Sequence, residues 1–172
     1  MPGPHEAGSR VSNLGHHWVL YVVLAFAGGL LTFVGAMAEQ KATDDATFRK
    51  LTDAYCVAWS SGTPVNASKF YAKDDGLVFY DVAPFSYTGW KDYLAGVQKE
   101  FFDTAASVTL TAGKELKTTR RGTIAWTTVP MHLSEKTKDG KDVQLNLRYT
   151  GIWEKRGNTW LLVHEHISAP LS

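Results

Sequence analysis

The sequence contains a single cysteine, Cys56, so no intrachain disulfide can form. Its apolar neighbours, Val57, Ala58 and Trp59, indicate a small buried side chain rather than a nucleophile. Positive and negative charges nearly balance: the chain has 18 Lys and Arg and 17 Asp and Glu, and its formal net charge is +1. This balance gives no reason to expect a nucleic acid partner or an anionic membrane surface. No HExxH or CxxC spacing occurs, and we expect no metal and no cofactor.

The N-terminal region lacks charge over a long stretch. No Asp, Glu, Lys or Arg lies between Arg10 and Glu39, and this gap contains the apolar run 18–38. Ala36-Met37-Ala38 places small residues at the two positions that a signal peptidase reads, so we interpret residues 1–38 as a signal peptide of an exported, periplasmic or secreted protein. The alternative is an uncleaved membrane anchor over 18–38, because the run has about the length that spans a bilayer. N-terminal sequencing of the mature protein distinguishes the two.

Residues 39–172 contain no internal repeat and no linker, which predicts one folded domain. The apolar spacing predicts a first helix that begins at Asp44 or Asp45 and ends near Trp59. Two further helices are expected at 65–71 and 90–102. Strands are expected at 77–82, 106–120, 123–136, 143–155 and 159–168, with a hairpin turn at Asp139-Gly140. The fold class is therefore α+β, with three N-terminal helices packed on a curved, mostly antiparallel sheet.

Two segments resemble a known family: FYAKDDGLVFYDVAPFSYTGW at 70–90 and YTGIWEKRGNTWLLVHEHIS at 149–168. In element order and length, about residues 44–170 resemble the NTF2-like superfamily, in particular its SnoaL-like and ketosteroid isomerase-like members. The second segment is similar to the final hairpin of the SnoaL-like branch, which ends in a W-x-x-x-H-x-H-x-S pattern, as does the association domain of calmodulin-dependent kinase II. The resemblance implies a conical pocket between the helices and the concave sheet face, and a homodimer formed through the sheet.

The resemblance to the isomerase implies proton transfer. There, a Tyr on the first helix donates to the substrate oxyanion and an Asp after the first strand moves the proton; Tyr55 and Asp81 occupy similar positions here. The protonated Asp of the isomerase's penultimate strand is replaced by Tyr149 or Thr150, which is a departure from the family pattern. A carboxylate at Asp81 acts as a base only if partial burial raises its pKa. The competing interpretation is that Asp81 accepts hydrogen bonds from its loop or pairs with His166.

The last predicted strand contains the sequence Val163-His164-Glu165-His166. Because residues i and i+2 of a strand share a face, His164 and His166 are expected on the face of Trp160 and Leu162, with Glu165 on the opposite face. We therefore predict that the two imidazoles line the pocket and that His166 pairs with Asp81, which would make a base near neutral pH. The face that carries Glu165 would then be available to a partner subunit.

The other pocket candidates are mostly aromatic. They are Trp59, Tyr80, Tyr87, Trp90, Trp126, Tyr149 and His164. Together with the catalytic candidates Asp81, Tyr55 and His166, they predict a hydrophobic pocket for a small apolar carbonyl ligand and proton transfer of the isomerase or cyclase type. The alternative function is a non-enzymatic module for ligand binding or dimer assembly, because one fold hosts many functions.

Overall fold

The computed structural model describes the backbone of residues 15–82 and 84–171, with side chains from residue 34 onward. Contacts divide the chain into two units, Met1–Lys41 and Ala42–Ser172. Among the described residues, no helix is both long and apolar enough to cross a membrane. Residues 1–14 of the predicted signal peptide lie outside the described part, and the predicted cleavage before Glu39 falls inside helix α1, Gly15–Trp59.

The predicted start of the first helix was wrong. Helix α1 begins at Gly15, and Asp44 lies inside it, where its carboxylate accepts a hydrogen bond from Arg120 Nη1 at 2.9 Å instead of capping a helix end. Residues 39–47 contain no Gly or Pro, so no strong helix breaker separates the apolar run from the amphipathic segment. The predicted end is confirmed, because α1 ends at Trp59, just before Ser60 to Pro64.

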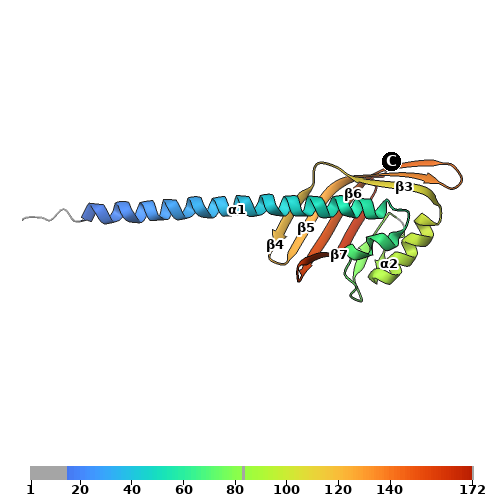
Figure 1. The fold of residues 1–172 in the computed structure, drawn as a ribbon, viewed down its shortest axis with the longest axis horizontal. Helices are drawn as coiled ribbons and strands as arrows, with labels where there is room; N and C mark the ends of the chain where they lie inside the picture. Colours follow the sequence, from blue (N-terminus) through green and yellow to red (C-terminus); the bar gives the residue numbers. More distant parts are fainter. Residues whose placement is uncertain (1–14, 83, 172) are drawn as a thin grey trace, which may run out of the picture. The chain divides into compact units, whose positions relative to one another are not determined.

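The other helices are short. The second predicted helix is a 3₁₀ segment, η1 at Pro64–Phe70, with Thr63 as its N-cap. The third consists of helix α2 at Gly89–Val97, which continues into a π-helical turn, η2 at Gln98–Phe102. Within the unit 42–172, α1 and α2 cover one face of the curved sheet (Figure 1).

The sheet has seven strands in the order β2-β1-β7-β6-β5-β3, with β4 also paired to β5. The strands are β1 Val78–Tyr80, β2 Tyr87–Thr88, β3 Ala105–Ala112, β4 Lys117–Arg121, β5 Ile124–Thr137, β6 Asp142–Arg156 and β7 Thr159–Ser168. All pairings are antiparallel except β1 with β7. The predicted α+β class with a curved, mostly antiparallel sheet is confirmed.

The strand predicted at 106–120 is two strands, β3 and β4, and the prediction of one continuous strand was wrong. The interruption begins where Gly113 N donates to Pro130 O at 2.8 Å. Pro130 has no N–H to donate in return, so the ladder with β5 stops at this point. Strand β4 then resumes pairing with β5 from Lys117 opposite Thr128.

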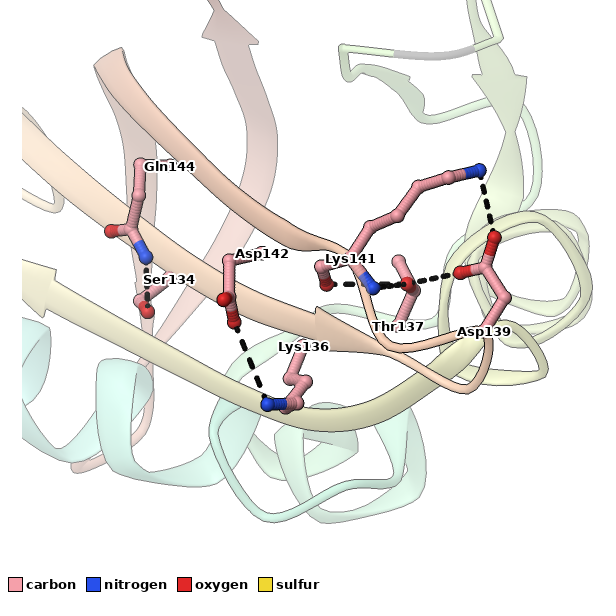
Figure 2. Close-up of polar contacts among 7 residues, drawn as sticks. All are labelled: Ser134, Lys136, Thr137, Asp139, Lys141, Asp142 and Gln144. Carbon is pink, nitrogen blue, oxygen red and sulfur yellow. Dashed lines mark hydrogen bonds and ion pairs between the residues drawn. The ribbon is translucent and has the colours of Figure 1, made fainter.

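The hairpin that joins β5 to β6 confirms the predicted Asp139-Gly140 turn. Gly140 has a φ of +89°, a conformation that favours glycine. Figure 2 shows the polar contacts of this hairpin, in which Lys141 Nζ lies 2.7 Å from Asp139 and Gln144 donates to Ser134 Oγ at 2.7 Å. The turn sets the register in which β6 crosses the sheet beside β5.

Strand β7 contains a β-bulge that reverses the predicted orientation of its polar residues. Ile152 pairs with His164 and the next residue, Trp153, pairs with Leu162, so Val163 is an extra residue. Leu162 and Glu165 are therefore both buried on the helix side, whereas His166 is exposed. The prediction that both histidines face inward and Glu165 outward was wrong, because it assumed unbroken alternation through Val163.

Candidate functional site

A cavity of about 190 Å³ lies between the end of α1, helix α2 with η2, and the sheet. Its wall is largely apolar, formed by residues including Val97, Phe101, Phe102, Leu110, Leu133 and Leu147. For comparison, a dry apolar cavity of about 150 Å³ holds a benzene molecule. The volume therefore suits a compound with one ring and small substituents.

The polar groups that border this cavity are few, and the charged ones are all acidic. The carboxyl-bearing residues are Asp81, Glu100 and Glu135, and no Lys, Arg or His is among the lining residues of the described chain. Burial raises the pKa of Glu135. The cavity is therefore unfavourable for an anionic ligand.

Behind the wall of the cavity, the carboxyl group of Glu165 is fully buried among three tyrosines. Tyr71 and Tyr93 donate their hydroxyls to Oε1 at 2.7 and 2.5 Å, and Tyr55 donates to Oε2 at 3.0 Å. The three donors come from three separate elements, namely α1, the residue after η1, and α2. Burial raises the pKa of Glu165 to about 7, although the hydrogen bonds from the tyrosines oppose this shift.

Asp81 follows β1 and connects the buried cluster to the cavity. Its Oδ1 accepts a hydrogen bond from Val82 N at 2.7 Å, and its Oδ2 lies 3.1 Å from Tyr93 Oη. Burial raises the pKa of Asp81 to about 6. A carboxyl group in this state gains or loses a proton near neutral pH, as a general acid or base requires.

Among the predicted site residues, Tyr55, Trp59 and Asp81 line the cavity. The hydroxyl hydrogen of Tyr55 is donated to Glu165, so it does not point to a ligand oxygen as the isomerase resemblance implied. Trp59 Nε1 is buried and has no hydrogen-bond partner among the described residues. Tyr149 is buried beside Tyr55, with 5.3 Å between ring centroids, and its hydroxyl likewise lacks a partner among the described residues.

The two histidines lie away from the cavity. His164 Nδ1 is 2.7 Å from Val78 O, and the ring of Tyr80 packs edge-on against His164 and His166 at 5.4 and 5.7 Å. The predicted pair of His166 with Asp81 is therefore not formed, and the side-chain partner of Asp81 is Tyr93. The β-bulge at Val163 is the physical reason, because it turns the imidazoles to the outer side of β7.

The remaining aromatic candidates have packing contacts outside the cavity. Trp90 stacks on Tyr71 with 4.4 Å between ring centroids, and Lys73 Nζ lies 3.8 Å above the Trp90 ring. Tyr87 packs against Tyr93 at 5.0 Å between centroids. Trp126 contacts the guanidinium of Arg121, whose Cζ is 5.6 Å from the ring.

Sequence reasoning missed Tyr71, Tyr93 and Glu165. Tyr93 falls within the helix predicted at 90–102, and nothing in the sequence there distinguishes a core tyrosine from one that donates to a buried acid. Glu165 is the polar residue on the buried face of β7, but which face is buried at this position depends on the bulge. In the part of the chain described with side chains, no group of three His, Cys, Asp or Glu is arranged to hold a metal ion.

The cone of helices on a curved sheet, closed around one cavity, is the architecture of NTF2-like proteins. Residues 48–172 match the SnoaL-like domain, so the chain belongs to that family. No curated protein matches the sequence. This match does not extend to the ketosteroid isomerase-like proteins, so the resemblance to them stays a prediction.

Solved structures support the same fold. An NTF2-like superfamily protein from Salmonella enterica serovar Typhimurium superposes with a TM-score of 0.65 at 17% identity, covering 76% of this chain and 94% of that chain. An NTF2-like protein from Pseudomonas putida gives 0.63 at 20% identity, covering 76% and 89%. A hexachlorocyclohexane dehydrochlorinase, LinA type 2, gives 0.63 at 10% identity, covering 76% and 90%. At these identities the likeness establishes the fold alone.

Proposed function

We propose that this domain binds a small, uncharged ring compound bearing a carbonyl group and moves a proton on it, with Asp81 as the base. The observation that carries the proposal is the Asp81 carboxyl, which borders an apolar cavity and has a pKa that burial raises to about 6. A base in a largely dry site needs a pKa near the working pH, and a surface aspartate does not meet this condition.

The oxygen of the ligand needs a hydrogen-bond donor, and we assign this role to Trp59. Its indole N–H is buried without a partner among the described residues, and its side chain borders the cavity. A donor that is already desolvated stabilises the negative charge that develops on an enolate oxygen without first giving up a hydrogen bond. In this assignment Trp59 takes the role that the isomerase resemblance had given to Tyr55.

The dimensions and charges of the cavity define the class of ligand. A volume of about 190 Å³ suits one ring and is too small for a compound of four fused rings. The carboxyl groups of Glu100 and Glu135 border the same space and would repel a ligand carboxylate. The preferred substrate is therefore neutral and monocyclic.

The proposed step is a proton shift within the ligand. The Asp81 carboxylate removes the proton from the carbon next to the carbonyl, the electron pair moves onto oxygen, and Trp59 N–H donates to that oxygen. In a β,γ-unsaturated ketone, Asp81 then returns the proton to the γ carbon. The carbon–carbon double bond becomes conjugated with the carbonyl, and Asp81 is a carboxylate again. No oxidant or second substrate is required.

The test uses a β,γ-unsaturated cyclohexenone, whose conversion to the conjugated isomer is followed by ultraviolet absorbance. We expect turnover by the wild type, and a loss of about 100-fold or more in kcat for Asp81→Asn with little change in ligand affinity. Asp142→Asn is the matched control, since it makes the same change at a side chain that is 73% exposed. A β,γ-unsaturated steroid ketone should not be turned over.

Retention of turnover in Asp81→Asn would show that Asp81 is not the base. If the wild type binds the cyclohexenone without isomerising it, the domain is a non-enzymatic ligand-binding module. One observation favours this second function: the hydroxyls of Tyr55, Tyr71 and Tyr93 are all directed to Glu165 instead of to the cavity.

A further inference from the structure

The hydroxyl of Tyr93 lies between two carboxyl groups. Its oxygen is 2.5 Å from Glu165 Oε1 and 3.1 Å from Asp81 Oδ2. A phenol has one hydrogen to donate, so it cannot donate to both acids. One of the two contacts therefore requires a proton on the carboxyl group, which then donates to the Tyr93 oxygen.

The surroundings of the two acids also favour one shared proton. No Lys, Arg or His of the described chain makes a hydrogen bond or ion pair with Asp81 or Glu165. Two carboxylates so close together, without a compensating cation, cannot both ionise readily. Two hydroxyls besides Tyr93, those of Tyr55 and Tyr71, stabilise a negative charge on Glu165.

We propose that Asp81 and Glu165 share a single proton through the Tyr93 hydroxyl, and that Glu165 is a positioning residue that determines whether Asp81 is a base or an acid. In one state Asp81 carries the proton and donates to Tyr93, which donates to the Glu165 carboxylate. In the other state Glu165 carries the proton and donates to Tyr93, which donates to the Asp81 carboxylate. Two hydrogens move along the chain, and Tyr93 stays neutral in both states.

The role of this relay rests on the proposed function. With the proton on Glu165, Asp81 is a carboxylate next to the cavity and can accept a proton from the ligand. With the proton on Asp81, the same group is an acid and the negative charge lies on Glu165. The hydroxyls of Tyr55 and Tyr71 stabilise this charge by donating hydrogen bonds to it. The pair keeps a total charge of −1 in both resting states.

Other titratable groups surround the pair. Burial, and after it the charge of Glu165, raises the pKa of Tyr149 on β6. Burial, and after it the charge of Asp81, raises the pKa of Tyr87 on β2. Glu100 and Glu135 border the same cavity as Asp81, and His166 borders an outer hollow that Asp81 also reaches. Burial raises the pKa of Cys56 and of Tyr87 to about 12, so both stay neutral near pH 7.

The test follows the carboxyl carbons of Asp81 and Glu165 by carbon-13 NMR in the labelled full-length protein, as a function of pH and without ligand. In the wild type each signal should show two titration steps, because the two groups titrate as a coupled pair. In Glu165→Gln the Asp81 signal should show one step, at a lower pH than the midpoint of the wild-type titration, since Tyr93 is then free to donate to the Asp81 carboxylate. The control Glu115→Gln, at an exposed loop residue, should leave both steps unchanged.

Tyr93→Phe provides a second variant, in which each acid should titrate in one step independent of the other. A single Asp81 step at the same pH in the wild type and Glu165→Gln would overturn the shared proton. This readout does not depend on turnover, so coupling without isomerisation of the cyclohexenone refutes the proposed function only. Isomerisation without coupling refutes the relay only.

Discussion

At the scale of single residues, the unusual feature is a carboxyl group, Glu165, at the centre of an aromatic core. Burying a charge is costly unless hydrogen bonds replace its hydration. The tyrosine hydroxyls at 2.5, 2.7 and 3.0 Å provide this replacement, and burial still raises the pKa of Glu165 to about 7. Glu165 therefore keeps its proton to a higher pH than a solvated glutamate does.

This shift predicts how stability depends on pH. The pKa of Glu165 is 4.5 in a solvated chain and about 7 in the fold, so between these values the folded state holds a proton that the unfolded state has lost. The contribution of this group is thus fully present below about pH 4.5 and is lost as pH rises through about 7. Urea unfolding of the wild type and Glu165→Gln should show the wild type losing on the order of 2–3 kcal/mol more between pH 4.5 and pH 8.

The comparison of the two proteins cancels the titration of groups remote from Glu165. Among these, Asp74 and Asp139 have pKa values that are lowered by hydrogen bonds, mainly from Arg156 and Lys141 respectively. The stability that these two groups contribute is lost as the pH falls, opposite to the contribution of Glu165. Parallel stability curves for the two proteins would show that the Glu165 pKa is not raised in the fold.

At the scale of elements, one β-bulge in β7 determines which polar side chains are buried in the core. Period-two alternation correctly predicted that His164 and His166 share a face, but the extra residue, Val163, changes which face is buried beyond it. A bulge depends on how β7 fits the curvature and register of β6, and these are long-range properties. The turn residues were predictable because the Asp-Gly signal is local.

Helix α2, which carries Tyr93, is held close to β2 by a glycine. A Cβ added at Gly96 would overlap the ring of Tyr87 and lie 2.9 Å from two further atoms of the same ring. Because Tyr87 is buried, its ring has little room to move. Gly96→Ala should therefore lower the free energy of unfolding by about 1–3 kcal/mol, as measured by urea denaturation.

Lys91→Ala, at an exposed position of the same helix, is the control and should change the free energy of unfolding by less than about 0.5 kcal/mol. If the clash is the cause, Gly96→Ala should cost clearly less in a Tyr87→Leu background than in the wild type. Equal costs in the two backgrounds would contradict this explanation.

At the scale of the whole molecule, we propose that the protein is a homodimer formed through the outer face of the sheet. Ile152 pairs with Trp126 on one side and with His164 on the other, so these residues form a strip across three strands. Glu165 is buried on the inner face, so it is not part of this surface, contrary to the orientation inferred from alternation. Trp126 and Ile152 are large apolar side chains that are only half-buried, which fits contact with a second subunit.

The dimer is tested by analytical ultracentrifugation. The wild type should sediment as a dimer and Ile152→Glu as a monomer, because a charge would be buried without a partner at the centre of the interface. Val57→Glu, at a position on α1 that is 72% exposed, should remain a dimer. A monomeric wild type would refute the proposal, and dissociation by Val57→Glu alone would place the interface on the helices.

Much of the secondary structure of this protein follows from local signals in its sequence. Apolar periodicity, the Asp139-Gly140 turn and the stop after Trp59 were sufficient to predict the α+β class and the element order. The cone and its pocket were implied by the resemblance to the NTF2-like superfamily, and Tyr55, Trp59 and Asp81 do line the cavity. Local signals failed at the start of α1 and at the break between β3 and β4, where helix propensity and the partner strand decide the boundary.

Which polar side chains meet depends on long-range packing. Tyr55, Tyr71, Tyr93 and Glu165 are separated by up to 110 positions in the chain, and they come together because three elements pack against β7 at one point. Their protonation depends on desolvation by that packing, which no local pattern encodes. Local signals thus defined the α+β class, whereas the bulge at Val163 and the packing of the helices connect Asp81 through Tyr93 to a buried acid, and not to the histidines.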